Sequence, residues 1–176
     1  MAILDRFKKQ IKMSSINRLL IFIFSIIIAL IFSCNPNEKR DYKPLIIISY
    51  YKGLIESPVA IKCGQVSKIP PIEFKVDTLI SDTSLIHKIS NCASNLRTEA
   101  SSNCEGRLDC FIIQNSDTTK LCIGTFDCIK KNGIGMHRND TLLYLIRKNS
   151  GYYNYFRKDE LRYFDELKIF DPDLLK

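Results

Sequence analysis

The chain has 176 residues, with 26 Lys and Arg against 19 Asp and Glu, a formal net charge of +7. Five of the basic residues and one acidic residue precede position 34, so residues 34–176 carry a formal charge of only +3. Phosphate recognition needs a concentrated basic face, so this balance argues against nucleic acid as a partner. The short basic pairs Lys130-Lys131 and Arg147-Lys148 are predicted to be solvated surface.

The first 33 residues have the three parts of a secretory signal. Four basic residues (Lys8, Lys9, Lys12 and Arg18) precede an uncharged apolar block at 19–32, and a small residue, Ser33, follows it. A membrane-spanning helix needs about 20 apolar residues, so this block is short for a permanent span. Met13 is an alternative start, since the residues before it form a long, charged lead-in.

The residues Ile31-Phe32-Ser33-Cys34 resemble a bacterial lipobox, with a branched aliphatic residue at −3, a small one at −1 and Cys at +1. Phe32 departs from the commonest pattern, where a smaller residue stands at −2. The resemblance covers only the first 34 residues. It implies cleavage before Cys34, whose thiol and new amine then carry acyl chains that bind the membrane. The implied location is the bacterial cell envelope, with the outer membrane favoured. The alternative is an uncleaved signal anchor with an unrelated Cys.

The remainder divides into a tether and one domain. Residues 34–44 hold the lipidated Cys and a polar stretch with Pro36 and Pro44, which predicts a linker. Residues 45–176 have the length of one ordinary domain. The run Leu45-Ile46-Ile47-Ile48 leads to Tyr51 without alternation and predicts a central strand covered on both faces.

Further elements follow in chain order. Alternating residues predict strands at 59–63 and at 72–76, the second with one wet face. Asp82 is expected to cap a helix whose apolar stripe ends at Leu96, with His87 on the opposite, solvent side. Strands are predicted at 108–113 and 120–123 around a turn at 115–118. Asn132-Gly133 predicts a second reversal.

Two more helices are expected towards the C-terminus. Asp140 is predicted to cap a helix over 141–149, which Gly151 ends, and a last amphipathic helix runs from Leu161 to Phe170 before Pro172. Strands in local antiparallel runs, with helices between and after them, indicate an α+β fold. We expect an antiparallel sheet of about 4–6 strands with two or three packed helices.

Six cysteines remain after Cys34, an even number that permits disulfides in an exported protein. Two segments, starting at Cys104 and Cys122, share the pattern C-x-G-x-[LF]-D-C-[FI]. Zinc is disfavoured, because structural sites usually place ligands two to four residues apart and five residues intervene here. We predict at least one disulfide; the alternative is that all six stay reduced as small buried hydrophobes. The four cysteines expected to supply it are Cys104, Cys110, Cys122 and Cys128.

No catalytic motif is present, and neither a cofactor nor a metal is expected. The two histidines, His87 and His137, have no local signature of a Cys–His nucleophilic pair. Aromatic residues gather at Tyr152, Tyr153, Tyr155 and Phe156, which indicates either a binding surface or a segment that closes the core. The sequence favours a lipid-anchored binding or interaction module, with another envelope protein as a possible partner. The alternative is an envelope enzyme with a Cys- or His-based site.

Overall fold

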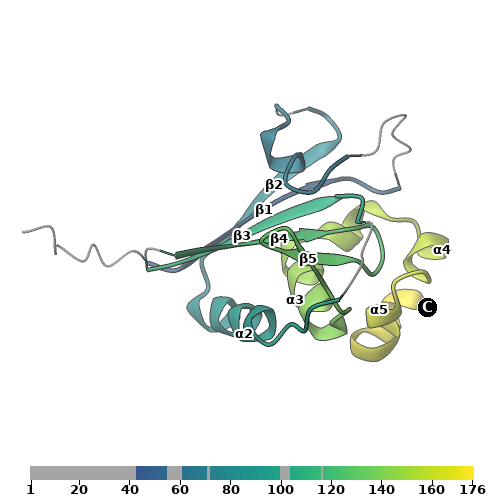
Figure 1. Cartoon of the computed structure of the whole chain (residues 1–176). Helices are drawn as coiled ribbons and strands as arrows, with labels where there is room; N and C mark the ends of the chain where they lie inside the picture. Colours follow the sequence, from purple (N-terminus) through teal and green to yellow (C-terminus); the bar gives the residue numbers. More distant parts are fainter. Residues whose placement is uncertain (1–42, 55–60, 71, 100–103, 116) are drawn as a thin grey trace, which may run out of the picture. The chain divides into compact units, whose positions relative to one another are not determined.

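The structure, a computed structural model, describes residues 43–54, 61–70, 72–99, 104–115 and 117–176 (Figure 1). All of them belong to one compact unit. The predicted signal segment, Cys34 and the tether as far as position 42 lie outside the described residues, as do positions 59 and 60 of the predicted strand 59–63. None of the helices formed by the described residues has the length and apolar character needed to span a membrane.

A six-stranded antiparallel sheet forms the frame of the domain, in the order β2-β1-β3-β4-β5-β6. With the helices described below it confirms the predicted α+β class. Strand β1 lies between β2 and β3 and is central, as its unbroken aliphatic run predicts. The strands are β1 Leu45–Tyr51, β2 Lys75–Ile80, β3 Leu108–Gln114, β4 Asp117–Ile123, β5 Ile129–Lys131 and β6 Ile134–Met136.

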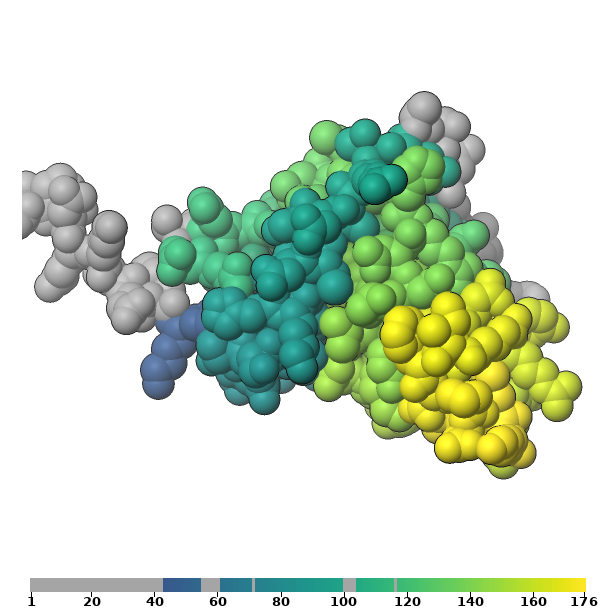
Figure 2. All heavy atoms as spheres, turned by 90° about the horizontal axis from the view of Figure 1, so that it is seen from below, coloured from purple at the N-terminus to yellow at the C-terminus, as the bar shows by residue number. Residues whose placement is uncertain are grey.

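The helices lie on one face of this sheet (Figures 1 and 2). Figure 2 views that face and shows α2 in teal and the C-terminal residues in yellow, with α3 between them. The helices are α2 Thr83–Ser94, α3 Asp140–Ser150, α4 Lys158–Leu161 and α5 Asp165–Phe170. Short 3-10 turns are η1 Val66–Lys68, η2 Tyr152–Tyr155 and η3 Pro172–Leu175.

The core lies between the helices and the inward residues of the strands. Alternate side chains of β1, at Ile46, Ile48 and Tyr50, are buried there. Burial raises the pKa of Tyr50 to about 12, so its phenol stays protonated. The hydroxyl donates a hydrogen bond of 2.9 Å to the carbonyl oxygen of Ser150, which joins the central strand to the end of α3.

The helix starts show one prediction confirmed and one wrong. Asp82 caps α2, accepting a hydrogen bond of 2.8 Å from the Leu85 amide. Asn139, not Asp140, caps α3, accepting 2.9 Å from the Leu142 amide. Both residue types are good caps, and Asp140 instead takes the first helical position, where its charge favours the helix dipole. Gly151 ends α3 in the left-handed conformation, as predicted.

Three predicted strands differ from the structure. The strand expected at 120–123 begins earlier, at Asp117, inside the predicted turn 115–118. The half-buried strand expected at 72–76 begins later, at Lys75, and continues to Ile80. Its pairing with β1 decides this, because Ile80 lies opposite Ile46 and Val76 opposite Tyr50, which puts both side chains on the core face. In the described part of the predicted strand 59–63, Lys62 makes only an isolated bridge to Glu105.

The single helix expected from Leu161 to Phe170 is two short helices, α4 and α5. Phe164 separates them with extended backbone (φ −94°, ψ 96°) and places a fully buried ring in the core. The ring lies 4.9 Å from that of Phe156, edge to face. Aromatic packing at this point outweighs the continuity of one helix, and periodicity alone does not reveal that choice.

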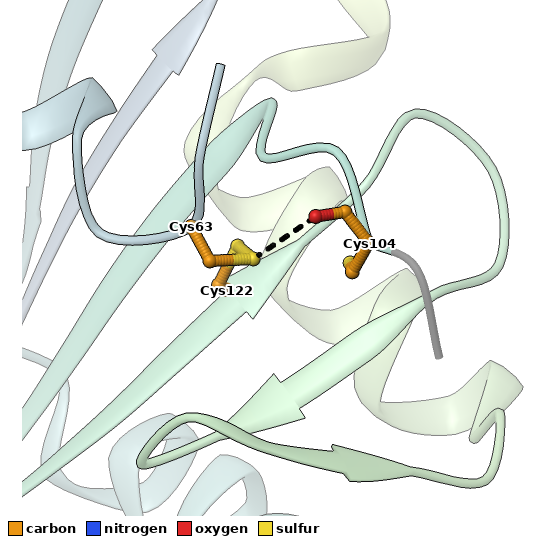
Figure 3. A group of neighbouring side chains, drawn as sticks. All are labelled: Cys63, Cys104 and Cys122. Atoms are coloured by element: carbon orange, nitrogen blue, oxygen red, sulfur yellow. Dashed lines mark hydrogen bonds between the residues drawn. A yellow bond between two sulfur atoms is a disulfide. The ribbon is translucent and has the colours of Figure 1, made fainter. Parts of the chain in front are cut away.

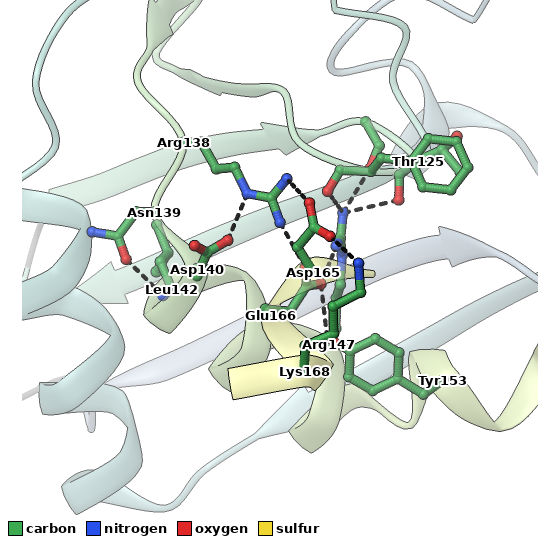
Figure 4. Close-up of polar contacts among 12 residues, drawn as sticks. Thr125, Arg138, Asn139, Asp140, Leu142, Arg147, Tyr153, Asp165, Glu166 and Lys168 are labelled. Atoms are coloured by element: carbon green, nitrogen blue, oxygen red, sulfur yellow. Dashed lines mark hydrogen bonds and ion pairs between the residues drawn. The ribbon is translucent and has the colours of Figure 1, made fainter. Parts of the chain in front are cut away.

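The prediction that Arg147 and Lys148 are both exposed is also wrong in part, because Arg147 is fully buried. Its guanidinium forms an ion pair with Glu166 of α5, which is equally buried (Figure 4). Tyr153 donates a further hydrogen bond of 2.9 Å to the Glu166 carboxylate. On its other side Arg147 donates to three backbone carbonyls, those of Gly124, Thr125 and Phe126, at 3.0–3.1 Å.

Arg147 therefore joins α3, α5 and the β4–β5 loop at one point. Removing one partner from such a pair leaves a buried charge without its counter-ion, which costs about 3–5 kcal/mol. We expect Glu166→Ala to lower the free energy of unfolding by about that amount, measured by urea denaturation. Lys168→Ala, which removes an exposed pair with Asp165 on the same helix, should leave the midpoint unchanged. Equal midpoints for wild type and Glu166→Ala would contradict this role.

Candidate functional site

None of the described residues forms an α-helix on the second face of the sheet, which we call the helix-free face, and residues 61–70 cover part of it (Figure 1). The turn η1 in this segment contacts β1 and β3. Under it Ser49, Tyr51 and Asp109 are buried, whereas Ile47 of the same face remains 36 % exposed. The predicted cover of β1 on both faces therefore holds for only half of the strand. We call residues 61–70 the covering segment.

Asp109 holds the covering segment to the sheet. Its carboxylate is 1 % exposed and accepts two backbone hydrogen bonds of 2.9 Å, from the amides of Gly64 and Ser67. Hydrogen bonds to a charged group contribute more than neutral ones, about 1.5–3 kcal/mol each. The two amides compensate a buried carboxylate that would otherwise be unfavourable. Val66, between them, is fully buried.

A disulfide ties the same segment to β4. Cys63 is bonded to Cys122, with Cα atoms 5.4 Å apart and a sequence separation of 59 residues. A loop of that length gives about 4 kcal/mol in the chain-entropy model. At the other end of the segment, Lys75 of β2 donates 2.9 Å to the carbonyl of Ile69. The covering segment is therefore fixed by a disulfide and by backbone hydrogen bonds to two charged side chains, those of Asp109 and Lys75.

A second disulfide joins Cys104 to Cys128. Figure 3 shows Cys104 beside the Cys63–Cys122 disulfide. The sulfurs of Cys63, Cys104 and Cys122 all lie within 4.8 Å of one another. Because both pairs are oxidised, none of these sulfurs is a thiolate able to bind a metal. Disulfide bonding is thus confirmed, but Cys110 takes no part in it and Cys63 does.

The glycines of the repeated pattern fit against these disulfides. A Cβ on Gly106 would lie 3.2 Å from the Cys122 sulfur, and one on Gly124 would overlap the Cys128 sulfur. Gly106 therefore leaves room for the Cys63–Cys122 disulfide, and Gly124 leaves room for the Cys104–Cys128 disulfide. In each case the disulfide contains the first cysteine of the other copy of the pattern. The second cysteines differ, since Cys128 is bonded and Cys110 is a free, buried thiol. The repeat reflects crossed packing around two disulfides rather than two equivalent units.

A cavity of about 510 Å³ opens between the covering segment and the sheet. Its floor is formed by outward residues of β3 and β4, among them Phe111 and Lys120, which are cross-strand neighbours. Lys130 of β5, opposite Cys122, contributes a second lysine. Lys68 of the covering segment contributes a third. We call this cavity the lysine pocket.

The charge in the lysine pocket is unbalanced. Within the part of the chain that the structure describes, the ammonium groups of Lys68, Lys120 and Lys130 make no ion pair and no hydrogen bond. Asp109 is the one acidic residue that the described part of the chain contributes to the lining, and its carboxylate already accepts hydrogen bonds from two backbone amides. Among the described residues, three cations therefore share a concave surface with no carboxylate paired to them, an arrangement suited to an anionic ligand.

The other predicted site residues are not brought together. His87 and His137 are exposed, and within the described ranges neither imidazole makes a hydrogen bond or ion pair. Burial raises the thiol pKa of both free cysteines, Cys92 and Cys110, which disfavours the reactive thiolate. Among the described residues the geometry therefore supplies no Cys–His pair.

The aromatic cluster mostly closes the core. Tyr152, Tyr153 and Phe156 are 9 % exposed or less, whereas Tyr155 is 41 % exposed. The amine of Lys52 lies 5.4 Å above the Tyr155 ring, a cation–π contact. Of the four residues predicted as a binding surface, only Tyr155 offers its side chain to solvent.

The sequence analysis missed the lysine pocket, because its lysines stand far apart in the chain. The available signal was the alternation of side chains along a strand, which places every second residue on the same face. By this alternation Lys120 and Cys122 share one face of β4, and Asp109 and Phe111 share one face of β3. Comparisons with protein-family models, with curated proteins and with solved structures find no match.

Proposed function

We propose that this chain is a lipid-anchored protein of the bacterial cell envelope that acts as a binding module for an anionic ligand, held in the lysine pocket. The observation that carries the proposal is the set of three lysines, Lys68, Lys120 and Lys130, around one cavity without a carboxylate partner among the described residues. The resemblance of Ile31–Cys34 to a lipobox supports the anchor, and the two disulfides suit an oxidising compartment.

Electrostatics favours an anion here over a cation or a neutral molecule. One ammonium group 4 Å from an anion contributes about 1 kcal/mol in bulk water and about 4 kcal/mol at the effective dielectric of a protein surface. Three such groups around one cavity therefore attract a small multivalent anion despite partial screening by salt. The buried Asp109 opposes this little, because two backbone amides solvate its charge.

A binding role fits the geometry better than catalysis. Cys–His chemistry requires a nucleophile within hydrogen-bond reach of its base. Here both imidazoles are exposed, and the two free thiols have raised pKa values. The strong contacts at the site, Asp109 with the covering segment and Cys63 with Cys122, are structural ones that shape a cavity.

The anchor predicts the fate of Cys34. In Cys34→Ala the acyl acceptor is missing, so we expect no incorporation of radiolabelled fatty acid and an uncleaved precursor on gels. Ser33→Ala keeps a small residue before the cleavage point and should be acylated normally. Label on the Cys34→Ala protein, or none on the wild type, would exclude the lipid anchor.

The lysine pocket predicts charge-dependent binding. For the full-length protein in phosphatidylcholine nanodiscs, calorimetry should detect pyrophosphate binding that weakens as salt is added. In Lys120→Gln/Lys130→Gln we expect the affinity to fall at least tenfold, because two of the three cations are removed.

Lys88→Gln/Lys158→Gln is the matched control, since both lysines are exposed and neither lines the pocket. Its affinity should equal that of the wild type. If pyrophosphate does not bind, or if both double variants weaken equally, the pocket is not an anion site.

A further inference from the structure

An apolar row on the helix-free face leads directly to the lysine pocket. The strand register aligns Leu79 of β2, Ile47 of β1 and Phe111 of β3 as consecutive cross-strand neighbours. The next residue in the same row is Lys120 of β4. We call Leu79, Ile47 and Phe111 the apolar row; it ends at a cation.

This row lies beside the covering segment rather than under it. The side chain of Leu79 is 61 % exposed and that of Ile47 is 36 % exposed. Ser49, the next residue of β1 on the same face, is only 3 % exposed. Phe111 is half-buried and also lines the lysine pocket, so the row and the pocket form one surface. Exposed large apolar side chains that adjoin a ligand cavity indicate part of a binding surface.

The lysine pocket and the apolar row match different parts of one ligand, a charged part and an apolar part. Deepening the anion-binding function proposed above, and resting on it, we propose that the ligand is a single-chain anionic amphiphile. Its charged head occupies the lysine pocket at Lys68, Lys120 and Lys130, and its hydrocarbon chain lies along the apolar row. The charge of the head complements the unpaired lysines, and the chain removes the side chains of Ile47 and Leu79 from water.

The dimensions fit such a molecule. Neighbouring strands are about 4.8 Å apart, so the row from Phe111 to Leu79 is roughly 10 Å long. An extended chain advances about 1.2 Å per bond, so roughly eight carbons cover the row. Lys68 stands on the covering segment while Lys120 and Lys130 stand on the sheet, so the three cations surround a cavity. One head group can enter it, whereas a planar lipid surface cannot.

Photocrosslinking tests this on the full-length protein in phosphatidylcholine nanodiscs. The probe is dodecyl phosphate with a diazirine at the chain terminus, and mass spectrometry locates the label. We expect label on peptides that contain Ile47, Leu79 or Phe111. Octyl phosphate should suppress it at a concentration at least tenfold lower than methyl phosphate, because only the longer molecule covers the row. Octyltrimethylammonium, with the opposite head charge, should compete at least tenfold less well than octyl phosphate.

Two variants separate the chain contact from the head contact. Ile47→Thr/Leu79→Ser should lose at least tenfold of the labelling while keeping the wild-type affinity for pyrophosphate. Ile169→Ser is the matched control, since Ile169 is 62 % exposed on α5 and should leave the labelling unchanged. Equal competition by methyl and octyl phosphate, or label elsewhere, would overturn the amphiphile while the anion site stands. If, in addition, the wild-type protein did not bind pyrophosphate, both proposals would be overturned.

One further arm asks whether the head group comes from the bilayer. Part of the phosphatidylcholine in the nanodiscs is replaced by phosphatidylglycerol, which offers an anionic head within a membrane. Unchanged labelling supports a free amphiphile. Suppression as complete as with octyl phosphate means that the surface binds membrane lipid, and the proposal is then wrong.

Discussion

The buried carboxylate of Asp109 is the contact on which the helix-free face depends. It is compensated only if the amides of Gly64 and Ser67 reach it, so it requires the covering segment to lie against the sheet. The Cys63–Cys122 disulfide reduces the freedom of the same segment in the unfolded chain. Together they turn a flat sheet face into one with a cavity. The lysine pocket is therefore a consequence of how one acidic side chain is solvated.

The two faces of the sheet carry different kinds of residues and contacts. The helix face holds the aliphatic core and the buried Arg147–Glu166 pair, which fixes the C-terminal helices and the β4–β5 loop. That loop ends at Cys128, and its disulfide to Cys104 lies beside Cys63–Cys122. Stability on one face is thus linked mechanically to the shape of the other. The helix-free face carries the lysines and the apolar row that are proposed to bind the ligand.

The sequence predicted the class of fold because local signals are strong where periodicity is simple. The aliphatic run of β1, the Asp82 cap and the Asn132-Gly133 turn, where both residues have positive φ, follow from local chemistry. Contacts between residues far apart in the chain could not be predicted from the sequence. The burial of Arg147 depends on Glu166, 19 residues away, and Cys63 pairs with Cys122 across 59 residues. The lysine pocket joins three segments whose spacing in the chain carries no pattern.

Disulfide mapping is the most direct test of this account, because its central claim is that the covering segment is fixed over β4 and β3. The protein is denatured without reduction, alkylated, digested, and analysed for linked peptides by mass spectrometry. The account predicts that the Cys63 peptide is linked to the Cys122 peptide, that Cys104 is linked to Cys128, and that Cys92 and Cys110 carry the alkyl group. Cys63 found alkylated, or linked to any cysteine other than Cys122, would contradict it.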